Sequence, residues 1–298
     1  MGTHSAEVEI GERFEFGENW TRFLSHLKEP QIDDAVRSLQ KMLNVSDLRH
    51  RTFVDAGCGS GLFSLAARKM GAEVHSFDFD PQSVACTKEL RNRYFPDDPR
   101  WRIEEASVLD TSYLERLGQF DVVYSWGGLH HTGAMWKALD NVSRLVKPGG
   151  LLFIAIYNDQ GIRSNLWTWV KRLYNRTPRL LRFIIVIPAF FAGYWPHMVL
   201  GIVRLRPFQF IREYDRNGRG MNIWRDLIDW VGGYPFEVAK PGELFDFYHE
   251  RGFQLEKLTT CAGSCGNNQL VLRRQGVPAG QEWPQIDADA RRFNEFSS

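Results

Sequence analysis

Short apolar segments alternate with helix-like segments from residue 52 onwards, and this alternation constrains the fold more than any other feature of the sequence. The runs at 52–57, 73–80, 101–110, 120–126 and 147–158 have the length and apolar content of strands, with helical patterns between them. Strands that alternate with helices indicate a parallel sheet with helices on both faces. The sequence therefore predicts a doubly wound α/β fold.

The alternation is interrupted once, by an aromatic-rich stretch at 162–238. A helix at 240–253 and strands at 254–263 and 268–274 then resume it, which brings the sheet to seven mostly parallel strands. The predicted parts of the chain are an N-terminal helical or lid segment (1–49), a core (50–161), a substrate-cap insertion (162–238), the C-terminal part of the core (239–275) and a tail (276–298).

Charge and cysteine content exclude several classes of protein. The chain has 37 Lys and Arg against 36 Asp and Glu, whereas a protein that holds a phosphate backbone usually has a basic excess. We therefore expect a small-molecule substrate and no nucleic acid. The four cysteines form no paired C-x-x-C pattern, so we expect no metal site. The first 20 residues carry charges where a signal peptide needs an apolar core, which predicts a cytoplasmic protein.

The stretch "VDAGCGSG", residues 54–61, places three glycines between a strand and a helix. Glycines there allow a tight turn and let a ligand approach the backbone at the helix N-terminus. The spacing is G-x-G-x-G, not the G-x-G-x-x-G of dinucleotide-binding proteins. Asp55 would repel a pyrophosphate but suits a cationic group such as an ammonium, which favours S-adenosylmethionine over NAD.

With this loop in register with "SFDFD" and "FDVVYSWGGLHH", the sequence resembles the class I S-adenosylmethionine-dependent methyltransferases. The resemblance covers residues 52–158 and the last two strands, and its L-H-H segment is similar to that of small-molecule methyltransferases, including those of quinone biosynthesis. It implies a Rossmann-like sheet with S-adenosylmethionine as cofactor. The cofactor-binding residues that it implies are Asp55, Gly57, Gly59 and Gly61 at the methionine part, Asp78 at the ribose hydroxyls, Phe79 at the adenine, and Ser107, Val108 and Ser125 nearby. Ser107 stands where many members have aspartate.

The segment "GGLHH", residues 127–131, follows the fourth strand, where ligands of doubly wound sheets bind. Methyl transfer to oxygen needs a base, and a neutral histidine suits that task. His130 and His131 are therefore the candidate catalytic residues, although either could serve only to hold the loop. Trp126, Tyr157 and Asn158 are candidate substrate-binding residues at the same edge of the sheet.

The run at 183–203 has no charged residue and is flanked by Arg179, Arg182, Arg204 and Arg206. Pro188 and Pro196 predict two short helices with a bend rather than one rod. These helices would pack over the site or in a homodimer interface, or make a peripheral membrane contact. A true membrane span is the least favoured reading. Helices packed over the site or in a dimer interface, and helices in contact with a membrane, would both favour an apolar or lipid-linked acceptor.

These features together predict a methyltransferase that acts on a small acceptor, most readily by O-methylation with a histidine as base. Carbon methylation of an aromatic or quinone precursor, a non-catalytic cofactor-binding regulatory protein, and an NAD-dependent enzyme are the alternatives.

Overall fold

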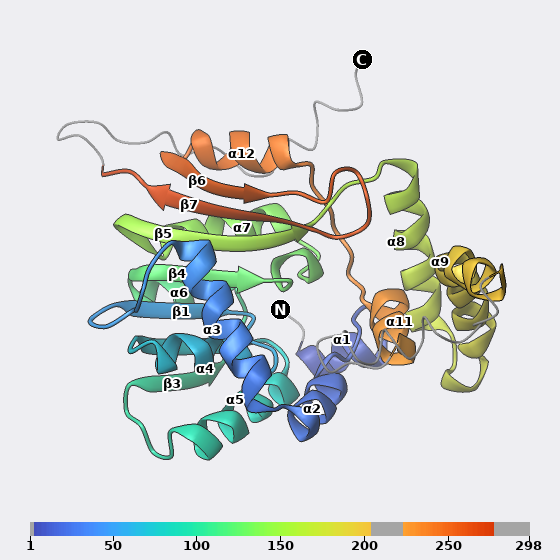
Figure 1. Ribbon diagram of the computed structural model, residues 1–298, viewed down its shortest axis with the longest axis horizontal. Coiled ribbons are helices and arrows are strands. Elements are labelled where there is room, and N and C mark those ends of the chain that lie inside the picture. The colour runs from blue at the N-terminus through green and yellow to red at the C-terminus, as the bar shows by residue number, and fades with distance from the viewer. Residues whose placement is uncertain (1–2, 204–222, 277–298) are drawn as a thin grey trace.

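A seven-stranded sheet with helices on both faces forms the centre of the computed structural model, which describes residues 3–203 and 223–276 (Figure 1). The strand order is β3-β2-β1-β4-β5-β7-β6, and β7 runs antiparallel to both its neighbours. The predicted doubly wound, mostly parallel sheet is thus confirmed. The strands are β1 (Thr52–Ala56), β2 (Glu73–Asp78), β3 (Trp101–Glu105), β4 (Phe120–Trp126), β5 (Val146–Tyr157), β6 (Phe253–Thr259) and β7 (Asn267–Arg274).

Each face of the sheet is covered by helices that bury one apolar core. The helices that contribute to the first core are α3 (Glu29–Leu43), α4 (Leu62–Lys69) and α5 (Pro81–Tyr94). Those that contribute to the second are α6 (Thr111–Leu117), α7 (Met135–Arg144) and α12 (Pro241–His249). Strands buried on both faces are expected to be almost continuously apolar, as residues 151–156 of β5 are.

The third strand is shorter than predicted, because it ends at Glu105 rather than at residue 110. The Ser107 hydroxyl accepts a hydrogen bond from the Leu109 amide, and the Asp110 carboxylate accepts one from the Tyr113 amide. These two contacts turn the chain and cap α6, a helix that the sequence pattern did not predict.

The N-terminal helices α1 (His4–Glu9) and α2 (Gly17–His26) lie between the sheet and the insertion (Figure 1). Phe14, in the loop between them, is buried in a cluster with residues of the insertion. Its backbone N–H donates to the Tyr234 carbonyl over 2.8 Å. The start of the chain therefore joins the insertion to the core.

The insertion contains α8 (Ile162–Arg176), the 3₁₀ turn η2 (Arg179–Leu181), α9 (Phe183–Val203) and α11 (Ile223–Gly232). The prediction of two short helices at 183–203 is wrong, because α9 is continuous through both prolines. An interior proline removes a hydrogen bond and tends to kink a helix, but neither proline ends α9. Arg204 and Arg206 lie outside the described residues. Over residues 3–203 and 223–276, no helix is long and apolar enough to cross a membrane.

Candidate active site

The glycine-rich loop between β1 and α4 has the backbone that its sequence predicts. Gly57, Gly59 and Gly61 have φ values of +80°, +53° and +76°, which side-chain-bearing residues rarely adopt. A Cβ on Gly61 would lie 2.8 Å from the Thr87 side chain, and one on Gly57 would lie 3.5 Å from Gly128. The loop thus packs closely on α5 and on the start of the "GGLHH" segment.

Asp55 lies at the end of β1 beneath this loop, and its carboxylate is fixed by a chain of hydrogen bonds. Ser64 donates to Asp55 over 2.5 Å, Ser76 donates to Ser64 over 2.8 Å, and the Trp101 indole donates to Ser76 over 2.9 Å. Burial is the main cause that raises the pKa of Asp55 to about 7, and the Ser64 hydroxyl opposes that rise. The side chain is oriented before any ligand binds.

Asp78 lies at the end of β2, on the other side of the loop. Its carboxylate accepts hydrogen bonds from the backbone amides of Gly59 and Asp80, each over 2.9 Å. Burial raises its pKa to about 6, although these amides favour the ionised form. Within the described part of the chain, neither Asp55 nor Asp78 has an ion-pair partner, so two acidic groups share a site with no protein cation.

The N-terminal segment lies across this edge of the sheet. The Arg13 guanidinium is 5.0 Å from the centre of the Phe79 ring, and the His4 ring meets Phe79 edge-on at 5.7 Å. A Cβ on Gly59 would lie 3.1 Å from the Trp20 ring, so Trp20 covers the glycine loop. The segment is therefore positioned at both the loop and the predicted adenine-contacting residue.

The other predicted cofactor residues lie at the same edge of the sheet but are partly engaged with the protein. Ser125 is fully buried and donates its hydroxyl to the Ala56 carbonyl over 2.6 Å, which ties β4 to β1. The Ser107 hydroxyl accepts from the Leu109 amide, and the Val108 carbonyl accepts from Asn141. The Val108 side chain packs against the apolar core.

His130 is fully buried, and its two ring nitrogens have different environments. The Tyr157 backbone N–H donates to Nδ1 over 3.3 Å, so in the neutral ring the proton is on Nε2. Nε2 is buried and has no hydrogen-bond partner among the described residues. Burial lowers the pKa of His130 well below its ordinary value, and His131 and Lys171 add to this effect. The ring is thus a neutral hydrogen-bond donor.

His131 has the opposite tautomer. Its Nδ1 lies 2.6 Å from the Pro235 carbonyl, which can only accept, so Nδ1 carries the proton and Nε2 has the lone pair. Burial lowers the pKa of His131 to about 3, and the Pro235 carbonyl opposes this shift. The ring lies 4.8 Å from Phe16 and 5.6 Å from Tyr157, between the N-terminal segment and β5. Of the two histidines, His131 has the geometry of a base.

Lys171 on α8 is a buried cation that the sequence analysis did not identify. Its side chain is fully buried, its ammonium donates to the Trp230 carbonyl, and it lies 4.3 Å and 4.6 Å from the ring centres of Trp230 and Phe236. Burial lowers its pKa to about 7, while the charge of Asp229 opposes the shift. The sequence signal for Lys171 is its helical spacing: it stands seven residues after Ser164 and four after Trp167, which places it on the inner side of α8.

Aromatic rings connect the two histidines to Lys171. Tyr157 lies 3.9 Å from His130, 5.6 Å from Trp230 and 5.3 Å from Phe236, measured between ring centres. We call His130, His131, Tyr157, Trp230, Phe236 and Lys171 the aromatic cluster. It joins the end of β5 to the insertion.

The remaining predicted substrate residues lie apart from this cluster or are engaged elsewhere. Asn158 donates to the Ser264 carbonyl and accepts from Asn268, so its amide holds the turn between β6 and β7. Trp126 packs against the core on the α3 side of the sheet. Of these three residues, Tyr157 contacts both histidines.

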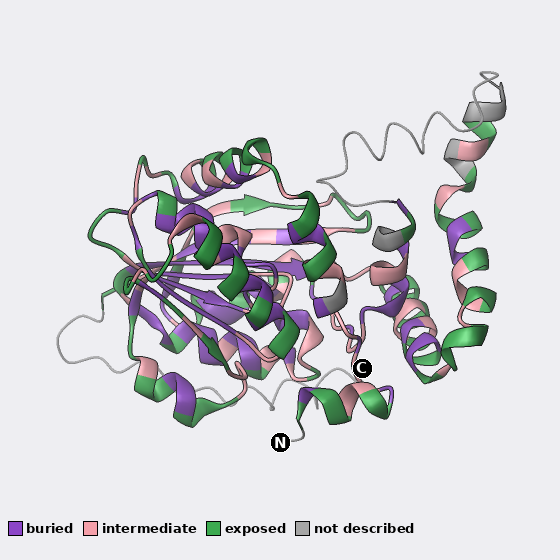
Figure 2. Ribbon diagram, turned by 90° about the horizontal axis from the view of Figure 1, so that it is seen from below, coloured by how far each residue is buried: buried purple, intermediate pink, exposed green. Residues whose placement is uncertain are grey.

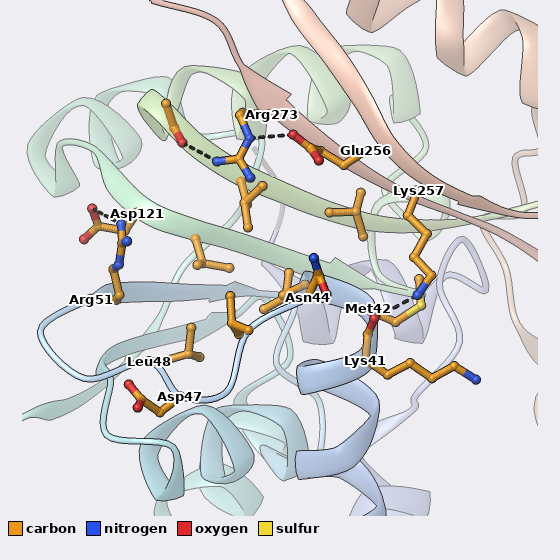
Figure 3. A pocket seen from close by; sticks show the side chains of 16 residues that line it. Lys41, Met42, Asn44, Asp47, Leu48, Arg51, Asp121, Glu256, Lys257 and Arg273 are labelled. Carbon is orange, nitrogen blue, oxygen red and sulfur yellow. Dashed lines mark hydrogen bonds and ion pairs between the residues drawn. The ribbon is translucent and has the colours of Figure 1, made fainter.

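Two cavities lie outside the glycine-loop edge. One, of about 460 Å³, lies at the opposite edge of the sheet, where charged side chains such as Arg273 and Glu256 pair with each other (Figure 3). The other, of about 530 Å³, lies between the N-terminal helices and α8 and is lined by Arg13, Phe14 and Tyr174. Arg13 links the second cavity to the rest of the site, since its guanidinium lies over the Phe79 ring and donates a hydrogen bond to the His131 carbonyl over 2.8 Å.

Comparison with known proteins assigns the central part of the chain. Residues 54–154 match a family model described as a methyltransferase domain. A ubiquinone biosynthesis O-methyltransferase from Colwellia psychrerythraea is 34% identical over 115 residues, which cover 38% of this chain and 44% of the relative. A tRNA U34 carboxymethyltransferase from Pseudoalteromonas atlantica is 26% identical over 177 residues, covering 51% and 53%. The chain spans about half the length of the curated relatives that it matches.

Among solved structures, PKMT2 from Rickettsia typhi in complex with AdoHcy is similar with a TM-score of 0.52 and 14% identity. The likeness covers 84% of this chain and 54% of that chain. At this identity it establishes the fold alone.

Proposed function

We propose that the chain is a class I S-adenosylmethionine-dependent methyltransferase, since residues 54–154 match a methyltransferase domain, and that it transfers a methyl group from S-adenosylmethionine to a small acceptor. One observation carries the proposal: Asp55 is buried and Asp78 is half-buried at a glycine loop, and no ion-pair partner for them lies within the described residues. A cationic ligand would offset the cost of ionising them.

The residues fit this cofactor. Asp55 would face the positive charge of the methionine part, and Gly57, Gly59 and Gly61 would let it approach the backbone. Asp78 would accept hydrogen bonds from the ribose hydroxyls, Phe79 would contact the adenine, and Ser107 and Val108 would complete the adenine side. Ser125 would support the cofactor site from β4 through its hydrogen bond to the Ala56 carbonyl. When bound, S-adenosylmethionine supplies an electrophilic methyl group.

Acceptor chemistry is assigned to the aromatic cluster. His131 presents a lone pair at Nε2, and its low pKa keeps that lone pair free of a proton across the physiological range. An acceptor hydroxyl becomes strongly acidic as its oxygen forms a bond to the methyl group, so a weak base can take its proton at that stage. His130 Nε2–H and the Lys171 ammonium would stabilise negative charge on the acceptor. This arrangement favours O-methylation.

The acceptor is assigned as apolar or lipid-linked. Tyr157, Trp230 and Phe236 supply an apolar wall beside the histidines, and the insertion at 162–238 contributes the two last of these. The O-methyltransferase named for ubiquinone biosynthesis is consistent with this class. Helices α8 to α11 would act as the cap of the acceptor site, and residues 13–20 as a lid over the cofactor. A peripheral membrane contact near 183–203 would bring such an acceptor to the protein.

Calorimetry tests the proposal without knowledge of the acceptor. We expect the full chain to bind S-adenosylmethionine and S-adenosylhomocysteine, and to release a proton on binding at pH 6 because Asp55 must ionise. Binding of NADH in their place would support the dinucleotide alternative. A wild-type protein that binds none of these compounds would exclude the proposed function.

A further inference from the structure

Helix α9 has an apolar side that no described part of the protein covers. The helix is apolar on all sides, a composition that normally belongs to a buried helix or a membrane-embedded one. Its inner side packs Ala189 and Phe190 against the insertion, each 6% exposed. The outer side projects Phe183 (55% exposed), Ile184 (57%), Ile187 (47%), Phe191 (51%), Trp195 (59%), Val199 (43%) and Leu200 (46%).

The neighbouring elements extend this exposure. Helix α8 exposes Ile162, Leu166, Trp169 and Leu173, which are spaced as one stripe along the helix, and Leu180 on η2 is 88% exposed. Elsewhere in the described residues, the large apolar side chains with comparable exposure are Ile10, Trp224, Phe245 and Leu258. Figure 2 shows α9 projecting away from the sheet, with exposed residues along its length. We call the exposed apolar side chains of α8, η2 and α9 the apolar face.

Positive charge surrounds this face. Besides the buried Lys171, residues 162–203 contain five arginines (Arg163, Arg172, Arg176, Arg179 and Arg182) and no aspartate or glutamate. Glu12 pairs with Arg172 and Arg176, and Glu15 lies 3.6 Å from Arg179. Exposed ion pairs of this kind contribute little to stability, so an anionic group from a ligand can replace the glutamate as the partner of each arginine at little cost.

We propose that the apolar face binds the surface of an anionic lipid bilayer, with α9 lying in the plane of the interface. An interfacial helix inserts apolar and aromatic side chains between the lipid headgroups while basic residues contact anionic lipids. A second copy of the chain is the less suitable partner, because pairing two such faces would bring both sets of arginines together without a carboxylate from this segment. This inference deepens the proposed function, because membrane binding would give the enzyme access to an apolar acceptor. Only that role rests on the proposed function; the binding itself does not.

Vesicle flotation with the full chain tests the inference. Vesicles of phosphatidylcholine with phosphatidylglycerol are compared with vesicles of phosphatidylcholine alone, for the wild type and for Ile187→Glu/Phe191→Glu. Both positions are about half exposed, so the variant is expected to fold. Phe245→Glu is the matched control, since this exposed phenylalanine lies on α12, away from the face. A circular dichroism spectrum and S-adenosylmethionine binding equal to those of the wild type establish that each variant is folded.

We expect binding to the anionic vesicles, at least about a tenfold loss of affinity in the double variant, and no change in Phe245→Glu. Arg176→Gln/Arg179→Gln should weaken binding less, and added salt should weaken it further. Absence of vesicle binding, equal binding to both lipid compositions, or a dimer that Ile187→Glu/Phe191→Glu dissociates would overturn the inference. Because vesicle binding requires no cofactor, it can fail while S-adenosylmethionine still binds, and the reverse also holds.

Discussion

The glycine-loop edge and the aromatic cluster both bury charged and polar side chains, but they satisfy them differently. At the loop, Asp55 accepts from Ser64, Asp78 accepts from two backbone amides, and Ser125 donates to a carbonyl. In the cluster, His130 Nε2 has no partner within the described residues, and the one hydrogen bond described for the Lys171 ammonium is to the Trp230 carbonyl.

The glycine-loop edge is therefore a preformed half of the site, and the aromatic cluster is an incomplete half. A carboxylate already oriented by the fold loses little entropy when a ligand arrives. A buried donor without an acceptor instead lowers stability until a ligand supplies one. We therefore expect cofactor binding to be governed by the loop, and the cluster to show its role through stability and acceptor dependence.

The largest effect is expected for Asp78→Asn. The Gly59 and Asp80 backbone amides donate to different carboxylate oxygens, so a circular dichroism spectrum equal to that of the wild type must establish that the variant is folded. The asparagine amide keeps an acceptor for only one of these two donors. It lacks the charge that strengthens two hydrogen bonds to the ribose, and we expect the affinity for S-adenosylmethionine to fall by about 100-fold in calorimetry. Asp121→Asn, at the opposite edge of the sheet, is the control and should bind as the wild type does. Unchanged binding by Asp78→Asn would remove this residue from the cofactor site.

Lys171→Met should stabilise the protein at neutral pH. The pKa of Lys171 is lowered to about 7 in the folded protein, so the unfolded chain takes up the proton at higher pH and wild-type stability falls as the pH drops from 10 to 7. Methionine abolishes this loss, and we expect a gain of ~2 kcal/mol at pH 6.5 that disappears near pH 10.

Urea unfolding at the two pH values measures this gain, and the exposed Lys41→Met serves as the control. A loss of stability at pH 6.5 would mean that the contacts of the ammonium with Trp230 and Phe236 outweigh the cost of burying it. The comparison of the two halves would then fail, because the cluster would be as well satisfied as the loop.

The preformed half could be predicted from the sequence because its determinants are local. Three glycines, Asp55 and Asp78 stand in or next to strands whose apolar pattern is unambiguous, and strand order places their ends at one edge. Helix α6 was missed because its start depends on the Ser107 and Asp110 side chains turning the chain after β3.

The cluster could not be predicted in the same way. The tautomer of His131 is set by the Pro235 carbonyl, 104 residues away in sequence, and Lys171 contacts Trp230, 59 residues away. The α9 helix was also misjudged, since proline content alone does not decide whether a long apolar segment bends. Asn158, predicted as a substrate contact, holds the β6–β7 turn through partners that no local pattern identifies.

A smaller effect on stability is expected for Asp55→Asn. Because the folded pKa of Asp55 is about 7, above its unfolded value, its contribution to stability is present at acid pH and is lost as the pH rises through 7. The amide does not ionise, so the variant should be more stable than the wild type by ~1 kcal/mol at pH 8 and no more stable near pH 4. Thermal unfolding of the apoprotein at both pH values measures this difference. A variant destabilised equally at both would show that the Ser64 hydrogen bond, rather than the charge, dominates at this position.

The smallest expected change is the absence of a titration at His131. With its pKa lowered to about 3, the ring should remain neutral with the proton on Nδ1 between pH 5 and pH 8, and its nitrogen chemical shifts in NMR should stay constant. Assignment is made by His131→Gln, which removes one set of signals. A ring that titrated near pH 6 would instead be exposed or paired with an anion, and its lone pair would be unavailable at acid pH. Constant shifts would show that Nε2 stays unprotonated between pH 5 and pH 8. A base at this position requires this, because its lone pair must be free to take the proton of the acceptor.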